Sequence, residues 1–224
     1  MIKQDTNSAT LSPKELGEHL RQPKGEVGKQ VALEMNKSNK GISLNTYKVL
    51  NVQDGNRVLE IGMGNGCFVK DLLALASNIS YVGVDYSEVM VQEATRINQE
   101  FVDRGTIQFQ HASIEALPFP DNSFDCITTT NTLYFWPQPT ENTKELLRVL
   151  KPGGKLSIAY RLKDCLNQLE QTKKGFAKYE PEEVEQLLID AGFSQVSTQE
   201  ILDPKVEYMG KIYQVKGVFS SGMK

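Results

Sequence analysis

The chain has 224 residues, of which 39% are hydrophobic and 24% are charged, and its formal net charge is −3. This length predicts one or two domains that can bury a full core without disulfides or metals. No apolar run approaches the roughly 18 residues that a transmembrane helix needs, and the polar N-terminus lacks the apolar core of a signal peptide. We therefore expect a cytoplasmic protein without a membrane span.

Metal-binding, disulfide-rich and nucleic-acid-binding classes are disfavoured by the composition. Cys67, Cys126 and Cys165 are widely spaced and form no CxxC pair, and the chain has only two histidines. Such spacing provides neither a disulfide framework nor a zinc site. Residues 41–150 carry 7 basic and 13 acidic side chains, a net charge of −6, which we interpret as a solvated acidic surface. Because phosphate binding needs clustered Lys and Arg, nucleic acid is not an expected partner.

Helical signals dominate the first 52 residues. Ser12, Pro13 and Glu15 are typical of a helix start, with a capping hydroxyl, a first-turn proline and an acid at the third helical position. The pattern predicts short helices at 13–21, 27–36 and 42–51, separated by Pro23-Lys24-Gly25 and Lys40-Gly41. We expect residues 1–52 to form a helical segment that can close over the site as a lid, and residues 53–224 to form the ligand-binding domain.

Strand-like and helix-like segments alternate along the rest of the chain. Seven segments have strand character, at 57–62, 81–85, 106–110, 126–130, 155–160, 195–202 and 211–219. Helices are predicted between them, at 66–77, 87–103, 141–150 and 181–191, the last of which ends at Gly192. This order predicts an α/β fold, a Rossmann-like, doubly wound, mostly parallel seven-stranded sheet with an antiparallel last strand.

A glycine-rich turn follows the first predicted strand, at the sheet edge where such folds bind ligands. It reads Glu60-Ile61-Gly62-Met63-Gly64-Asn65-Gly66 and opens a predicted helix, so its backbone can approach a ligand closely. Asp85 ends the second strand about twenty residues further on, where a carboxylate can accept hydrogen bonds from both hydroxyls of a ribose. A nicotinamide site is the main alternative, but its GxGxxG or GxGxxA fingerprint has a small residue where this chain has Cys67.

Four motifs agree in order and spacing with one known family. They read VLEIGMGNG, GVDYS, EALPFPDNSFD and RVLKPGG, and the similarity covers roughly residues 55–203. In these motifs the chain resembles the class I S-adenosylmethionine-dependent methyltransferases, and most closely the small-molecule branch that includes the ubiquinone and menaquinone biosynthesis enzymes. The resemblance implies S-adenosylmethionine as the cofactor and a small molecule as the substrate. A further hallmark of the quinone enzymes, after the fourth strand, is replaced here by NTLYFW.

The resemblance also implies which residues contact the cofactor. At the methionine end, Glu60 would organise the glycine loop, and the backbone of Gly62, Met63 and Gly64 would line the methionine moiety. Thr130 and Asn131 would face the sulfonium, and Asp85 would bind the ribose. At the adenine end, Tyr86 would pack on the ring, with Ser113 and Ile114 at its edge. Many relatives have an aspartate where this chain has Ser113, so a hydroxyl or the backbone has to bind the adenine amine here.

Two further polar residues are interpreted as structural. His111 ends the third predicted strand without a partner acid, and it is interpreted as a loop histidine with satisfied hydrogen bonds. Asp125 stands at the start of the fourth strand, the wrong end of the sheet for catalysis. Neither residue is therefore assigned to the reaction.

The aromatic segment 131–136 is the main indication of the substrate. Tyr134 and Trp136 are expected to face the pocket, where aromatic rings form an apolar wall and favour a sulfonium cation. Tyr134 and Asn131 are the candidate catalytic residues, although a tyrosine pKa of about 10 makes acid–base chemistry secondary. Arg161 follows the fifth strand, and it either holds an anionic group of the substrate or lies on the surface.

Together these patterns predict an enzyme, monomeric or homodimeric, that transfers a methyl group in line to a small, partly apolar molecule. Such a displacement depends mainly on alignment and water exclusion, which can contribute roughly 7–11 kcal/mol, so the lack of a His–Asp pair does not exclude catalysis. Two alternatives stay open. One is a protein of the same fold that binds a cofactor or metabolite without turnover, which a pocket blocked by Tyr134 or Trp136 would favour. The other is a nicotinamide-dependent oxidoreductase.

Overall fold

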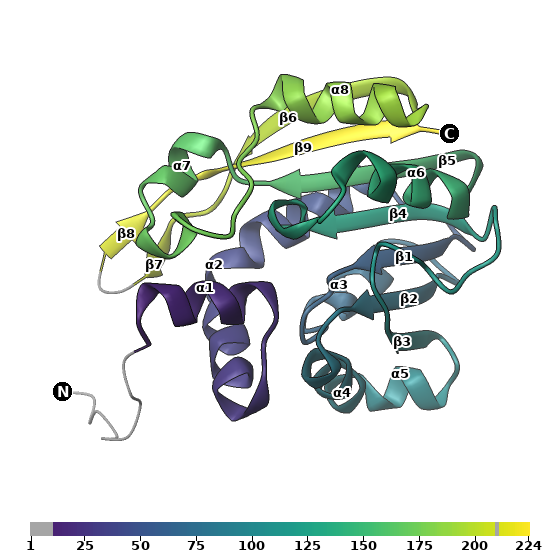
Figure 1. The fold of residues 1–224 in the computed structure, drawn as a ribbon. Coiled ribbons are helices and arrows are strands. Elements are labelled where there is room, and N and C mark those ends of the chain that lie inside the picture. The colour runs from purple at the N-terminus through teal and green to yellow at the C-terminus, as the bar shows by residue number, and fades with distance from the viewer. Residues whose placement is uncertain (1–10, 209–210) are drawn as a thin grey trace.

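The computed structural model describes residues 11–208 and 211–224. A seven-stranded sheet of order β3-β2-β1-β4-β5-β9-β6 forms the centre of the molecule (Figure 1). Its strands are β1 (Arg57–Ile61), β2 (Ser80–Asp85), β3 (Ile107–His111), β4 (Phe124–Thr130), β5 (Leu150–Tyr160), β6 (Ser194–Leu202) and β9 (Lys216–Met223). Neighbouring strands from β3 to β5 are parallel, whereas β9 is antiparallel to both β5 and β6. The Rossmann-like sheet with an antiparallel last strand is thus confirmed.

Helices cover both faces of this sheet (Figure 1). The helices on one face are α2 (Gly25–Leu50), α3 (Val69–Leu73), α4 (Glu88–Ile97) and α5 (Gln99–Asp103), and those on the other are α6 (Pro139–Val149) and α8 (Pro181–Ala191). Successive side chains of β1 explain why both layers form. Leu59 and Ile61 pack with the α6 and α8 side chains, whereas Val58 points to the opposite face and packs with Tyr47 of α2.

The N-terminal region differs from the prediction, because α2 is one helix of 26 residues with no break at Lys40-Gly41. Gly41 lies in its interior, and a Cβ atom there would come within 2.9 Å of the Asp203 Cγ and 3.0 Å of the Pro204 Cδ. The glycine therefore permits close packing of a continuous helix. Although α2 is long, none of the helices within the described residues is apolar enough to cross a membrane.

Other predicted boundaries also change. The helix predicted at 66–77 is only α3. It does not begin at Gly66, because that residue has a left-handed φ of +65°, which right-handed helices do not adopt. The helix predicted at 87–103 is divided at Asn98, whose side chain donates hydrogen bonds to the carbonyls of Gly66 and Ala94, both at 3.0 Å. The strand predicted at 211–219 is two strands, β9 and the short β8 (Lys211–Tyr213), which pairs with β7 (Val206–Tyr208) in a separate two-stranded sheet.

The remaining helical elements surround the carboxyl ends of the parallel strands. α1 (Pro13–Arg21) begins at the predicted Ser12 cap, which forms a reciprocal capping box with Glu15. The short helices that the sequence patterns did not predict are η1 (Leu133–Phe135), α7 (Lys163–Asn167) and η2 (Glu170–Thr172). α1 packs against η2, and a Cβ atom on Gly17 would lie 2.8 Å from the Gln171 carbonyl oxygen. This contact brings two distant parts of the chain together over one end of the sheet.

Candidate functional site

A cavity of about 720 Å³ lies at the carboxyl ends of the parallel strands. Residues from the ends of β1, β2 and β4 line its floor, and residues of α1, α2 and the segment 161–176 line its walls. The strand order reverses between β1 and β4, which is the point where open α/β sheets bind their ligands. This cavity is therefore the candidate site.

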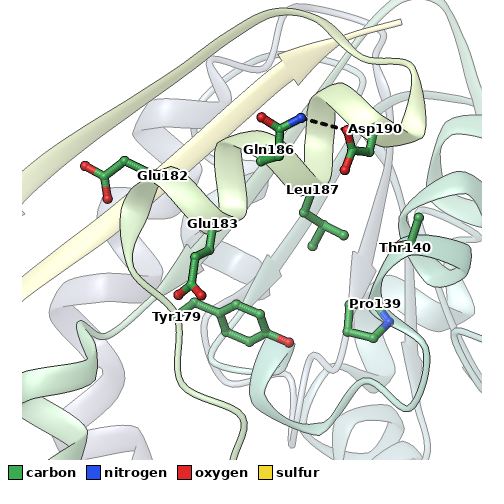
Figure 2. A pocket seen from close by; sticks show the side chains of 8 residues that line it. All are labelled: Pro139, Thr140, Tyr179, Glu182, Glu183, Gln186, Leu187 and Asp190. Atoms are coloured by element: carbon green, nitrogen blue, oxygen red, sulfur yellow. Dashed lines mark hydrogen bonds between the residues drawn. The ribbon is translucent and has the colours of Figure 1, made fainter.

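A second hollow, of about 510 Å³, lies between the start of α6 and one side of α8 (Figure 2). It contains none of the predicted site residues. The carboxylate of Glu183 accepts a hydrogen bond from the Glu180 backbone at the start of α8, and that of Asp190 accepts one from Gln186. These two carboxylates stabilise the helix.

The glycine loop forms one edge of the main cavity. Gly62 and Gly64 have left-handed φ angles of +69° and +59°, as does the neighbouring Gly66. Gly62 lies so close to the methyl group of Thr132, which follows β4, that a Cβ atom at residue 62 would overlap it. The loop thus brings bare backbone to the cavity between β1 and β4. Met63 and Gly64 belong to the loop but not to the cavity lining, which contains Gly62.

Asp85 lies at the end of β2 and lines the cavity. Its two carboxylate oxygens accept hydrogen bonds from the backbone N–H groups of Gly64 at 3.0 Å and Ser87 at 2.8 Å. Burial raises the pKa of Asp85 to about 6, although both N–H groups oppose the shift. Each oxygen keeps a free lone-pair direction, so the carboxylate can also accept two hydroxyl groups of a ligand.

Glu60 is buried and points away from the cavity, toward α2. Its carboxylate accepts hydrogen bonds from the hydroxyl groups of Tyr47 at 3.0 Å and Tyr81 at 2.7 Å. Burial raises its pKa to about 7, and the two hydroxyl groups partly oppose this shift. The structure therefore shows Glu60 linking α2 and β2 beneath the glycine loop.

The side chains after β2 and β3 form the other end of the cavity. Tyr86 is exposed along the cavity wall, and its carbonyl accepts a hydrogen bond from His111 at 3.0 Å, so His111 is engaged as predicted for a loop histidine. Ser113 donates a hydrogen bond to Glu115 at 3.0 Å, and both line the cavity beside Ile114. The sequence patterns did not indicate Glu115, because its place in the EALPF motif gives no sign that its carboxylate borders the cavity.

The segment after β4 lies at the centre of the cavity wall. Asn131 has a left-handed φ of +57°, and its side chain accepts a hydrogen bond from the Tyr134 hydroxyl at 3.0 Å. The same hydroxyl accepts the backbone N–H of Arg161 at 2.5 Å. Trp136 donates its indole N–H to the Thr132 hydroxyl at 3.1 Å. Tyr134 and Trp136 both line the cavity, yet each is about 95% buried, so they are fixed parts of its wall.

Two charged residues occupy contrasting positions. Arg161 is buried, lines the cavity and lies 2.6 Å from the carboxylate of Asp203, so it is not a surface residue. Asp125, at the opposite end of β4, accepts a hydrogen bond from the Arg57 backbone at 2.8 Å and pairs with Lys151 at 2.7 Å. These contacts agree with the structural interpretation of Asp125.

Thr130 and the segment 161–176 complete the wall. The hydroxyl of Thr130 donates a hydrogen bond to the buried Thr46 of α2 at 3.2 Å. The segment 161–176 contributes further lining residues that sequence patterns missed, among them Leu166, Gln171 and Phe176. No periodicity marks this irregular segment, so its position is evident only in the folded chain. Within the described residues, no cluster of His, Cys, Asp or Glu could hold a metal ion.

Comparison with known proteins identifies the family. The family model of the methyltransferase domain matches residues 59–158. The uncharacterized methyltransferase YdaC of Bacillus subtilis is 30% identical over 128 residues, which are 57% of this chain and 68% of that protein. The chain belongs to the class I S-adenosylmethionine-dependent methyltransferases. The methyltransferase resemblance and the cofactor, S-adenosylmethionine, are thus confirmed.

The ubiquinone/menaquinone biosynthesis C-methyltransferase UbiE of Pseudomonas entomophila is 38% identical to this methyltransferase over 121 residues. The match covers 50% of this chain but only 44% of UbiE, so the chain spans less than half of that enzyme.

Solved structures share the fold of this methyltransferase. The methyltransferase in a complex with the Haloferax volcanii Trm112 activator has a TM-score of 0.74 at 18% identity, over 94% of this chain and 97% of that one. A SAM-dependent methyltransferase of Thermotoga maritima has a TM-score of 0.66 at 24% identity, over 88% and 94% of the two chains.

Proposed function

We propose that this methyltransferase transfers the methyl group of S-adenosylmethionine, by in-line displacement, to a small and partly apolar molecule held in the main cavity. The observation that carries the proposal is the division of that cavity. The polar groups of Gly62, Asp85 and Glu115 lie along the ends of β1, β2 and β3, whereas aromatic and aliphatic side chains line the region between β4 and α7. One chamber thus offers a cofactor half and an acceptor half.

The residues of the cofactor half fit S-adenosylmethionine chemically. Asp85 has free lone pairs for the two ribose hydroxyls, and the bare backbone at Gly62 permits close approach of the methionine moiety. At the adenine end, Tyr86 and Ile114 provide packing surfaces, while Ser113 and Glu115 provide acceptors for the adenine amine. When bound, the cofactor supplies a methyl group that its sulfonium already activates.

The backbone of Met63 and Gly64 and the carboxylate of Glu60 support this half from behind the lining. Glu60 holds Tyr47 and Tyr81, and so fixes the strand that carries the loop. Thr130 ends β4 and Asn131 follows it, beside Gly62, which is where the reacting end of the cofactor would lie. We assign these residues to positioning of the cofactor.

In the acceptor half, Tyr134 and Trp136 exclude water and shape the wall. Burial raises the pKa of Tyr134 above its usual range, and its hydroxyl already joins Asn131 to the Arg161 backbone. We therefore assign Tyr134 to positioning of the two loops and not to proton abstraction. Alignment and water exclusion then provide the main contributions to catalysis.

The N-terminal helices form a cover over the chamber in this proposal. α1 and the first half of α2 contribute Leu20, Val31 and Met35 to the lining, and α1 meets η2 at Gly17. Entry of both ligands would require α1 and the 161–176 segment to separate. The second half of α2 is buried against the sheet and would stay in place.

Calorimetric titration with S-adenosylmethionine, S-adenosylhomocysteine and NAD tests the cofactor assignment. We expect micromolar binding of the first two and none of NAD, and at least about tenfold weaker binding by Asp85→Ala, which loses two charge-assisted hydrogen bonds. Asp125→Ala, at the opposite end of the sheet, is the matched control and should bind normally. Equal affinities of the two variants would contradict the ribose assignment. A screen for methylated small molecules with the active protein then tests the acceptor class.

A further inference from the structure

Arg161 and Asp203 form a buried ion pair behind the acceptor half of the cavity. Their side chains are 9% and 3% exposed, and the Nη1 atom of Arg161 lies 2.6 Å from the Asp203 Oδ2 atom. Arg161 lines the cavity, whereas Asp203 does not. The ion pair thus joins a residue of the cavity lining to a carboxylate outside that lining.

The guanidinium retains unused hydrogen-bonding capacity. It has five N–H donors, of which those on Nη1 face the Asp203 carboxylate, and within the described part of the chain no hydrogen bond forms from Nε or Nη2. Nε and Nη2 are not among the fully buried atoms that lack a partner, so a ligand can reach them. A ligand group in the cavity would provide the missing acceptors.

Asp203 is held firmly, so it can fix the direction of Arg161. Its other oxygen accepts a hydrogen bond from Asn45 of α2 at 3.3 Å, and its backbone N–H donates to the Val215 carbonyl at 2.9 Å. The absent side chain of Gly41 lets α2 approach this carboxylate closely. Three separate parts of the chain therefore meet at the ion pair.

We propose that Arg161 determines acceptor specificity by binding a carboxylate of the acceptor molecule. This proposal rests on the proposed function, because it requires an acceptor in the main cavity. The edge formed by Nε and Nη2 presents two parallel N–H groups, which match the two oxygens of a carboxylate. Among the described lining residues from the sheet and the 161–176 segment, Arg161 is the one cationic side chain.

The surroundings of Arg161 define the rest of the acceptor. Leu166, Phe135, Phe176 and Met35 line the same chamber and provide an apolar environment. A small carboxylic acid with an aromatic or aliphatic body satisfies both features, since its charged end meets the guanidinium and its body meets the apolar wall. The carboxylate then anchors the molecule in the chamber.

The test compares acids with amides of the same shape. Phenylacetate, 4-hydroxybenzoate and octanoate, each with its primary amide, are titrated into the protein with and without S-adenosylhomocysteine. We expect at least one acid to bind, and to bind at least about tenfold more tightly than its amide, because a charged hydrogen-bonded pair is lost in the amide. No acid binding, or equal binding of each acid and its amide, would overturn the proposal.

Variants assign the effect to Arg161. The double variant Arg161→Gln with Asp203→Asn removes both charges, so that neither is left buried without its partner. The single variant Arg161→Lys keeps the positive charge but lacks the two parallel N–H groups of the guanidinium. The single variant keeps the test valid if the double variant does not fold. Both should lose acid binding at least about tenfold while S-adenosylhomocysteine binding stays unchanged. The control replaces an exposed pair, Lys216→Gln with Glu200→Gln. If the Arg161 variants bind the acids as tightly as the unmodified protein does, the assignment to Arg161 is refuted. If the unmodified protein does not bind S-adenosylhomocysteine, the proposed function is refuted instead.

Discussion

Two glycines of the same loop differ in how much room each leaves for a side chain, and this difference can be measured as a change in stability. Gly62 and Gly64 both have left-handed φ angles, so alanine at either position is strained by about 1–2 kcal/mol. A Cβ atom at Gly64 has no neighbour within 4 Å, whereas one at Gly62 overlaps the methyl group of Thr132. Gly62→Ala therefore has a steric penalty that Gly64→Ala lacks.

The additional penalty follows from what Thr132 holds in place. Its hydroxyl contacts that of Thr129 and accepts the indole N–H of Trp136, so it cannot move without disturbing the cavity wall. Overpacking at such a site costs about 1–3 kcal/mol. We expect Gly64→Ala to lower the free energy of unfolding by about 1–2 kcal/mol, and Gly62→Ala to lower it by about 2–5 kcal/mol, the sum of strain and overpacking.

Chemical denaturation of the two variants measures this difference, and Thr132→Ser provides the rescue. Serine keeps the hydroxyl and removes the overlapping methyl group, after which the nearest atom to a Cβ at residue 62 would be the Cβ of residue 132, at an ordinary 3.4 Å. The substitution should restore about 1–3 kcal/mol in the Gly62→Ala background and nothing in the Gly64→Ala background. Equal destabilisation of the two single variants, or equal rescue, would refute the steric argument.

Two further predictions concern pH and helix packing. Since burial raises the pKa of Asp85 to about 6, its carboxylate is ionised only above that pH, and affinity for S-adenosylmethionine should rise about tenfold per pH unit below pH 6 and level off above it. In the free protein the raised pKa has the opposite effect, because the folded state binds the Asp85 proton more tightly than the unfolded state does. The protonated Asp85 therefore contributes to the free energy of unfolding below about pH 4, and this contribution is lost as the pH rises through 6. Asp85→Asn should flatten the affinity profile in calorimetry and remove its own part of the stability profile in denaturation, leaving the part due to Glu60, whose pKa burial raises to about 7. An affinity profile unchanged in the variant would exclude Asp85 as its source. Gly41→Ala should destabilise the protein by about 1–3 kcal/mol despite the higher helix propensity of alanine, because its Cβ would meet Asp203 at 2.9 Å. A gain in denaturation midpoint would show that this contact adapts freely.

The sequence predicted most of the sheet, and it placed the glycine loop and Asp85 at the edge of the sheet where the cavity lies. Buried strands such as β1 and β2 consist of short apolar runs bounded by turn residues, and these features are local. The glycine loop and Asp85 were predicted for the same reason. Each follows its strand directly, and in a parallel sheet the carboxyl ends of neighbouring strands meet at one edge. The positions of such residues can therefore be predicted from the local sequence and the order of the strands alone.

The continuity of α2 was not predictable, because Gly41 has the same local signature whether it interrupts a helix or packs against Asp203. Only the tertiary structure decided the position of Arg161, which local patterns left open between a substrate contact and the surface. Its burial depends on Asp203, in a turn beyond β6, and on a segment after β5 that has no periodicity. Local sequence therefore determined the strand ends and the glycine loop to which we assign the cofactor, whereas packing between distant segments determined the rest of the cavity wall, because those contacts form only when the whole chain is folded.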